Sequence, residues 1–261
     1  MSTKLKFCAN LTTMYVKETS SLLERYSLAK SFGFKAVECA FPYDIPIEDL
    51  KQTKESHGLE QVLINTFPGS SLGFAALKGQ EDAFLSSLEK SIEYCKALNC
   101  KRLHIMSGKI TDDVQASEEV LKSNLTKALP LLEKAGIVGL IEPINPYWVP
   151  NYFLNDFDLG AKIVETLNHP NLKLMLDLFH LQYLKGNVTN NIEKYLPLSG
   201  HVQLAQTPTR HEPNSPGEND YKYVLKQLEK NNYDGWIGLE YIPQNGTNEG
   251  LTWLDQYGYK L

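Results

Sequence analysis

The sequence has no apolar run approaching the roughly 18 residues that a membrane-spanning helix requires. Its first ten residues, MSTKLKFCAN, also lack the apolar segment of a secretory signal peptide. The four cysteines among 261 residues form no C-x-x-C pair, which indicates free thiols rather than a disulfide framework. Because free thiols are typical of a reducing compartment, we expect a cytoplasmic protein with no membrane partner.

Two further absences concern nucleotides and nucleic acids. Neither G-x-G-x-x-G nor G-x-x-x-x-G-K-[ST] occurs, so the best evidence for a nucleotide-binding open sheet is missing. The formal net charge is -5, from 26 basic and 31 acidic side chains. A protein that binds the phosphate backbone usually has a basic surface, so we expect no nucleic acid partner.

What the chain does contain is a regular alternation of β-forming segments and amphipathic helical segments. The helical segments, such as 20–33, 83–99, 118–136 and 221–232, have apolar residues three and four apart and end at Gly or Asn. Eight strand–helix units without a linker predict an α/β protein, a single-domain (β/α)₈ TIM barrel over residues 1–261. An open doubly wound sheet is the alternative. The predicted strands are 5–11, 34–41, 60–67, 101–108, 137–143, 172–178, 200–206 and 236–242.

The ends of four successive predicted strands have side chains with oxygen atoms, namely Glu142, Asp177, Gln203 and Glu240. In a (β/α)₈ barrel the loops after the strands build the active site. Neighbouring strands lie about 4.8 Å apart, so four side chains at the same level can converge on one point. An all-oxygen ligand set suits Mg²⁺ or Mn²⁺ better than Zn²⁺. The pattern therefore predicts a divalent-metal site.

Repulsion among the carboxylates supports the metal. At about 6 Å and an effective dielectric constant near 20, each pair of carboxylates repels by roughly 3 kcal/mol. That energy corresponds to about two pKa units, and a divalent cation removes it. A structural role is the alternative for each residue taken alone. Asp177, for example, precedes a helical turn and is also a candidate helix N-cap.

Two other polar residues lie inside predicted strands. Glu38 is in the middle of a strand, and we interpret it as half of a structural pair with Lys6. His104 alternates with apolar neighbours, which predicts that it faces the barrel interior as a satisfied core histidine. The cysteines are interpreted as small apolar core residues.

Eight motifs are distributed over nearly the whole chain, and that of the seventh strand is specific. They are NLTTMY (10–15), GFKAVECAFPY (33–43), VLINTFPG (62–69), EPIN (142–145), LDLFH (176–180), GHVQLAQTPTRHEPNSPGE (200–218), GLEYIP (238–243) and EGLTWL (249–254). Together these motifs resemble the hydroxypyruvate isomerase family, which belongs to the xylose-isomerase-like barrels.

The resemblance implies a barrel that interconverts hydroxypyruvate and 2-hydroxy-3-oxopropanoate (tartronate semialdehyde). It implies that Glu142 and Glu240 are the paired acid/base residues and that they hold a divalent metal together with Asp177 and a fourth residue. That fourth residue is usually histidine in the wider superfamily and is Gln203 here. Moving a carbonyl from C2 to C3 passes through an enediolate, for which two facing carboxylates are suited.

Such a substrate has a carboxylate that needs a cationic or hydrogen-bonding partner. Arg210 is our first candidate because a guanidinium can bind a carboxylate through two hydrogen bonds, and Lys109 is the second. A solvated loop charge is the alternative for either. His180 is predicted to donate to a substrate oxygen or to cap the following turn, and Asn65 to orient the substrate or to anchor its own loop.

Other functions fit the same pattern. The nearest is a related isomerase or epimerase acting on 2-oxo-tetronates or ketoses. A metal-dependent endonuclease for abasic DNA shares the barrel, but its zinc cluster is rich in histidine, whereas this chain has six scattered histidines. A non-catalytic sugar-acid binding protein is the third alternative. A homo-oligomer is compatible with any of these.

Overall fold

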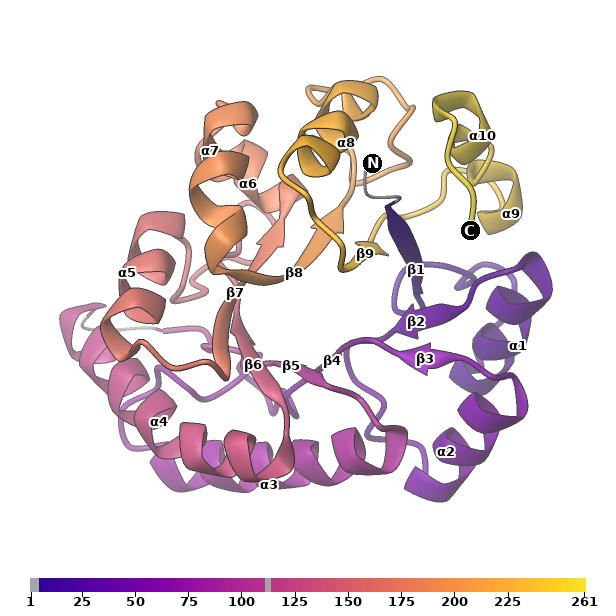
Figure 1. Cartoon of the computed structure of the whole chain (residues 1–261). Coiled ribbons are helices and arrows are strands. Elements are labelled where there is room, and N and C mark those ends of the chain that lie inside the picture. Colours follow the sequence, from indigo (N-terminus) through magenta and orange to yellow (C-terminus); the bar gives the residue numbers. More distant parts are fainter. Residues whose placement is uncertain (1–4, 111–113) are drawn as a thin grey trace.

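The computed structural model describes residues 5–110 and 114–261, and in these the parallel strands form a ring surrounded by helices (Figure 1). The strand order within the sheet is β3-β2-β1-β9-β8-β7-β6-β5-β4. The predicted (β/α)₈ barrel is confirmed. The strands are β1 (Lys6–Asn10), β2 (Ala36–Glu38), β3 (Glu60–Gln61), β4 (Ile64–Asn65), β5 (Arg102–His104), β6 (Val138–Ile141), β7 (Leu172–Asp177), β8 (Ser199–Leu204) and β9 (Trp236–Leu239).

The third position in the barrel is occupied by two short strands. β3 pairs with β2, and β4 pairs with β5. The segment predicted as one strand at 60–67 therefore connects the neighbouring strands β2 and β5 and so closes the ring. Val62 between them still donates its backbone N–H to the carbonyl of Val37 at 2.8 Å. Eight barrel positions therefore match the eight predicted strands.

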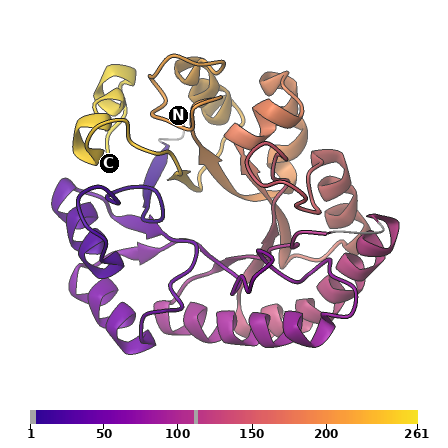
Figure 2. The same cartoon turned by 180° about the vertical axis from the view of Figure 1, so that it is seen from behind.

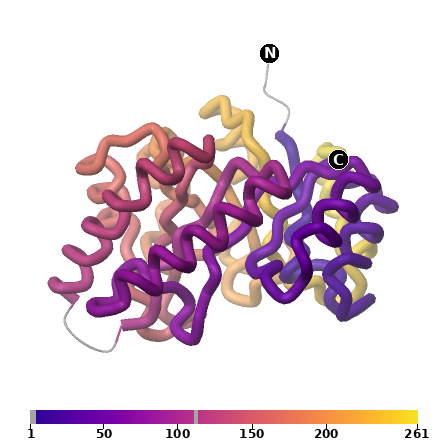
Figure 3. The backbone as a smooth tube through the Cα atoms, turned by 90° about the horizontal axis from the view of Figure 1, so that it is seen from below, coloured from indigo at the N-terminus to yellow at the C-terminus, as the bar shows by residue number. Residues whose placement is uncertain are grey.

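The helices form the outer layer, as the views from behind and from below show (Figures 2 and 3). The four predicted helical segments correspond to α1, α3, α4 and α8. No helix in the described ranges is long and apolar enough to cross a membrane. The helices are α1 (Leu22–Phe32), α2 (Ile47–Ser56), α3 (Glu81–Leu98), α4 (Val114–Ala135), α5 (Phe157–Leu167), α6 (Leu178–Leu184), α7 (Val188–Tyr195), α8 (Tyr221–Lys230), α9 (Thr247–Gly250) and α10 (Trp253–Tyr257), with a 3₁₀ turn at Leu196–Leu198.

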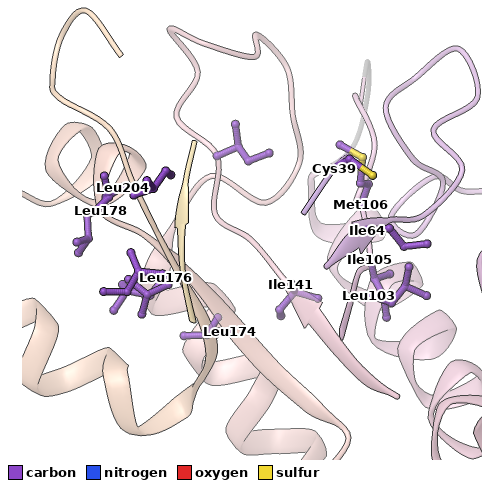
Figure 4. Packing of buried hydrophobic residues seen from close by; sticks show 14 of the residues in the cluster. Cys39, Ile64, Leu103, Ile105, Met106, Ile141, Leu174, Leu176, Leu178 and Leu204 are labelled. Atoms are coloured by element: carbon purple, nitrogen blue, oxygen red, sulfur yellow. The ribbon is translucent and has the colours of Figure 1, made fainter. Parts of the chain in front are cut away.

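Two apolar clusters hold the strands in place. The larger one includes Ile141, Leu174 and Leu176 of neighbouring strands (Figure 4). The smaller one comprises Cys8, Ala36, Val62, Leu63, Leu140 and Met175. Because side chains two residues apart share one face of a strand, Leu140 and Met175 lie directly below Glu142 and Asp177. The smaller cluster is thus a rigid apolar floor beneath the polar strand ends.

Gly238 in β9 makes room for a buried carboxylate. A Cβ atom at this position would lie 2.2 Å from Oε1 of Glu38. We expect Gly238→Ala to destabilise the protein by about 1–3 kcal/mol through overpacking, measured by urea unfolding. Gly246→Ala is the control, because the nearest atom to its Cβ is 3.7 Å away. Equal midpoints for the two variants would contradict the expected overpacking at Gly238.

Candidate active site

The four predicted metal ligands all lie at the carboxyl ends of the strands. Asp177 ends β7 and Gln203 is in β8, whereas Glu142 and Glu240 directly follow β6 and β9. Gln203 is paired in register with Asp177 on one side and with Gly238 on the other. Glu240 is therefore two residues beyond the level of Gln203, and the expectation of one common level is corrected. The stagger of a closed barrel causes this offset.

Asp177 caps a helix, the role that the sequence presented as the alternative to metal binding, and still has one free carboxylate oxygen. Its Oδ1 accepts a hydrogen bond from the backbone N–H of Phe179 at 2.7 Å and so caps helix α6. Its Oδ2 has no hydrogen-bond partner and is buried. The cap fixes the side chain, so the second oxygen is held toward the other carboxylates.

Glu142 lies between two histidines. Its Oε2 is 3.6 Å from Nδ1 of His104, and its Oε1 is 3.9 Å from Nε2 of His180. His180 Nε2 is also 3.5 Å from Oδ2 of Asp177. One ligand atom from each of Glu142, Asp177 and His180 therefore lies within 4.8 Å of the others. His104 faces the interior as predicted, but neither of its ring nitrogens has a hydrogen-bond partner.

The orientation of the His180 ring is set by Asn145, the last residue of EPIN. The backbone N–H of Asn145 donates to Nδ1 of His180 at 3.2 Å, and its side-chain nitrogen is 2.8 Å from the same atom. Because Nδ1 accepts, the proton of the neutral ring is on Nε2, which faces Asp177 and Glu142. His180 can therefore donate a hydrogen bond into the site.

Arg210 places a positive charge among the carboxylates. Its Nη2 is 2.6 Å from Oε2 of Glu240 and 3.6 Å from Oδ2 of Asp177. The guanidinium carbon is 4.6 Å from the ring centre of Trp148 and 4.8 Å from that of Phe179, so the two aromatic rings limit its movement.

The backbone holds Arg210 in an unusual conformation. Its φ is 56°, in the left-handed region, and its carbonyl accepts from the backbone N–H of Ile242 at 2.7 Å. The side chain is only 4% exposed, yet its Nη1 has no hydrogen-bond partner. A buried guanidinium with an unused donor suits an anionic group of a ligand.

Burial is the main cause of the pKa shifts at the site. It raises the pKa of Glu142 well above its ordinary value, and the charges of Asp177 and Glu240 add to the shift. Burial also raises the pKa of Asp177, and it raises that of Glu240 to about 7 although Arg210 opposes both shifts. Burial lowers the pKa of His180 well below its usual value, so its ring is neutral. The two glutamates thus have the tuning that acid/base residues need.

The unpartnered atoms fit the ligands of a hard cation. Oε1 of Glu142, Oδ2 of Asp177 and Oε1 of Gln203 are buried and have no hydrogen-bond partner. All three are oxygens, as Mg²⁺ and Mn²⁺ prefer. The cavity in front of them measures about 20 Å³, and its lining includes Glu142, Gln203 and Glu240.

Glu38 and His201 also belong to the site, although the sequence did not lead us to predict them there. Glu38 Oε2 is 2.6 Å from Nε2 of His201, whereas Lys6 lies over the ring of Trp236. The predicted pair of Glu38 with Lys6 is therefore wrong. The residue of β1 that lies level with Glu38 is Asn10, and Lys6 is four residues before it in the strand. A usable signal was present: His201 is two residues before Gln203 and shares its face of the strand.

The two remaining candidates lie in different environments. Asn65 ends β4 and lines the cavity, with its Nδ2 3.9 Å from the sulfur of Met106. Lys109 is exposed and is not among the residues that line the cavity. Close contacts connect Glu142, Asp177, His180, Arg210 and Glu240. Gln203 and Asn65 line the cavity together with the two glutamates, and Lys109 belongs to neither set.

Comparison with known proteins agrees with this architecture. Residues 26–257 match the family model described as xylose isomerase-like TIM barrel. A putative hydroxypyruvate isomerase of Danio rerio is 43% identical over 97% of this chain and 95% of its own length. A hydroxypyruvate isomerase of Escherichia coli is 36% identical, covering 97% and 99%. A 2-oxo-tetronate isomerase of Cupriavidus necator is 37% identical, covering 97% and 98%.

A solved structure extends the comparison to three dimensions. The crystal structure of an AP endonuclease, family 2, from Brucella melitensis is 38% identical and has a TM-score of 0.92. It covers 98% of this chain and is itself covered over 99% of its length. The relatives confirm the predicted isomerase. This chain belongs to the hydroxypyruvate isomerase family of xylose isomerase-like TIM barrels.

Proposed function

We propose that the protein interconverts hydroxypyruvate and 2-hydroxy-3-oxopropanoate. The observation that carries this proposal is a cavity lined by two glutamates of raised pKa, one of which, Glu240, is paired with Arg210, a guanidinium with an unused donor. The glutamates can take up and release protons near neutral pH, and the guanidinium of Arg210 can bind the substrate carboxylate.

The reaction balances with two net proton transfers, one from C3 to C2 and one from the C3 hydroxyl to the C2 oxygen. One glutamate removes a proton from C3 of hydroxypyruvate. The electron pair of that C–H bond forms the C2–C3 double bond, and the π pair of the C2 carbonyl moves onto the C2 oxygen to give an enediolate. The other glutamate returns a proton to C2, while the proton of the C3 hydroxyl passes to the C2 oxygen. In the reverse direction Glu142 and Glu240 exchange the roles of acid and base. His180 donates to a substrate oxygen, and Asn65, which lines the cavity, orients the substrate.

A divalent metal, Mg²⁺ or Mn²⁺, belongs to this proposal. Glu142, Asp177, Gln203 and Glu240 would hold it through oxygen atoms. When bound, such an ion stabilises negative charge on the oxygens of an enediolate. Without it, the neighbouring carboxylates favour protonation of Glu142, as its raised pKa indicates.

Removing the metal with a chelator is expected to lower the turnover of hydroxypyruvate at about pH 7.5 by at least roughly tenfold. The reason is that the carboxylates then share protons, and the enediolate charge loses its partner. Steady-state rates before and after dialysis, with Mg²⁺ or Mn²⁺ added back, measure the effect. An unchanged rate and pH profile in metal-free protein would exclude a catalytic metal.

A substrate panel tests the choice of substrate. Hydroxypyruvate, a 2-oxo-tetronate and an uncharged ketose are compared by kcat/KM, and the reaction is followed by NMR in D₂O. We expect hydroxypyruvate to be the best substrate and to exchange its C3 hydrogens for deuterium. Turnover confined to 2-oxo-tetronates or ketoses would assign the chain to one of those activities. Binding without exchange would identify a sugar-acid binding protein.

The Brucella melitensis protein, described as an AP endonuclease, suggests a second candidate, an endonuclease acting on abasic DNA. The net charge of -5 opposes it, because DNA binding depends on basic contacts to phosphates. A gel-shift titration with an abasic duplex at low salt is expected to show no complex.

We also propose a cytoplasmic location, supported by four cysteines that are all free and buried.

A further inference from the structure

Glu38 is a buried carboxylate with hydrogen-bond contacts to four side chains. It is 1% exposed and lies level with Asn10 in the neighbouring strand. Its Oε1 accepts from Nδ2 of Asn10 at 2.9 Å and from Nε2 of Gln203 at 2.7 Å. Its Oε2 is 2.6 Å from Nε2 of His201, with Sγ of Cys8 at 3.6 Å. Both carboxylate oxygens are therefore engaged in hydrogen bonds.

These contacts determine which end of the Gln203 amide faces the cavity. A carboxylate oxygen accepts hydrogen bonds, and Oε1 of Glu38 already accepts from Nδ2 of Asn10. Gln203 accordingly turns its NH₂ group toward this oxygen, with Nε2 at 2.7 Å. Gln203 is 2% exposed, and its Oε1 is left without a partner.

The free oxygen of Gln203 belongs to the same cavity wall as Glu142 and Glu240. Without Glu38, either end of the amide could face this cavity. An NH₂ group in that position would repel a metal ion, whereas a carbonyl oxygen binds it. The orientation of one amide thus decides whether the fourth position of the cluster attracts or repels a cation.

We propose that Glu38 is a positioning residue that locks the amide of Gln203 with its carbonyl oxygen toward the metal position. This inference rests on the proposed metal site and deepens it. Glu38 also lines the cavity, but hydrogen bonds already engage both of its carboxylate oxygens, so it acts through Gln203.

Glu38→Gln tests the lock, because the new amide has nearly the same shape but can face Gln203 with either a donor or an acceptor. We expect its Mn²⁺ affinity, measured by isothermal titration calorimetry, to fall about 10- to 100-fold, the range known for lost supporting contacts at metal sites. Cys8→Ala is the matched control, since it removes a contact to the other oxygen of Glu38 and leaves Gln203 unchanged. Its affinity should stay within about threefold of the unsubstituted protein even if its melting temperature falls.

A reciprocal exchange distinguishes positioning from a general loss of structure. Gln203→Glu alone places two carboxylates against each other and should weaken Mn²⁺ binding. The double variant Glu38→Gln/Gln203→Glu restores a donor opposite an acceptor and again turns an oxygen toward the cavity, so its affinity should recover at least about tenfold. Normal Mn²⁺ binding by Glu38→Gln, or a double variant no better than either single one, would overturn the proposal. If Glu38→Gln does not fold, the double variant decides.

A readout that needs no metal separates this proposal from the proposed function. In ¹⁵N-glutamine-labelled protein, the side-chain NH₂ signal of Gln203 is the one missing in Gln203→Glu. We expect slow hydrogen exchange of this NH₂ group in the unsubstituted protein and fast exchange in Glu38→Gln. If the unsubstituted protein binds no Mn²⁺, the metal proposal fails and this exchange rate alone decides the role of Glu38. Fast exchange in the unsubstituted protein would overturn it.

Discussion

Replacing either Glu142 or Glu240 by glutamine is expected to lower the kcat for hydroxypyruvate by about 10²- to 10⁴-fold, the usual contribution of a general acid or base. Glutamine keeps the shape of each side chain but cannot accept or return the proton. The pKa of Glu240 is raised to about 7 and that of Glu142 is raised well above its ordinary value, so both can exchange protons with carbon acids. Initial rates and deuterium exchange at C3 measure the loss.

Two controls distinguish the loss of a proton-transfer group from a general loss of structure. Glu212→Gln removes a charge from an equally buried glutamate that does not line the cavity, and it should keep near-normal turnover. Glu142→Gln should melt no lower than the unsubstituted metal-free protein at about pH 8. A carboxyl whose pKa is raised by folding stabilises the fold below its ordinary pKa of about 4.5, and that stabilisation is lost as pH rises through the raised value. Near-normal turnover in either glutamine variant would refute the assigned role.

Replacing Arg210 by methionine is expected to raise the KM for hydroxypyruvate about 10- to 100-fold and to change that for an uncharged ketose much less. A hydrogen bond to a charged group contributes roughly 1.5–3 kcal/mol, and the unused Nη1 donor is the group that a substrate carboxylate would occupy. Arg210→Lys should recover only part of the affinity because lysine lacks the planar fork. Steady-state kinetics on both substrates measure the difference.

The same variant should also shift the pH profile. Arg210 lowers the pKa of Glu240, which burial raises to about 7, so without the guanidinium this carboxyl stays protonated to higher pH. The acidic limb of kcat/KM should therefore move upward in Arg210→Met. Lys109→Met is the comparison, since its exposed side chain lies outside the cavity and a smaller rise in KM is expected. A larger effect from Lys109 than from Arg210 would reverse the assignment.

Much of the fold was predictable because its signals are local. The alternation of β-forming and amphipathic segments indicated eight strand positions, and apolar spacing located α1, α3, α4 and α8 close to their observed bounds. The break between β3 and β4 was not visible, because the run EQVLINTF has continuous β propensity. It arises from the need of one strand to pair with neighbours on both sides of the closing barrel.

Local sequence is enough to show which residues have oxygen atoms at the strand ends, since Glu142, Asp177, Gln203 and Glu240 each interrupt or end a β-forming run. The partners of such residues depend on the folded barrel. The contacts that complete the site join residues far apart in the sequence. Arg210 and Glu240 are 30 positions apart, His180 and Asn145 are 35 apart, and Glu38 and Gln203 are 165 apart. Such contacts depend on barrel stagger and loop paths, which no local pattern of residues encodes.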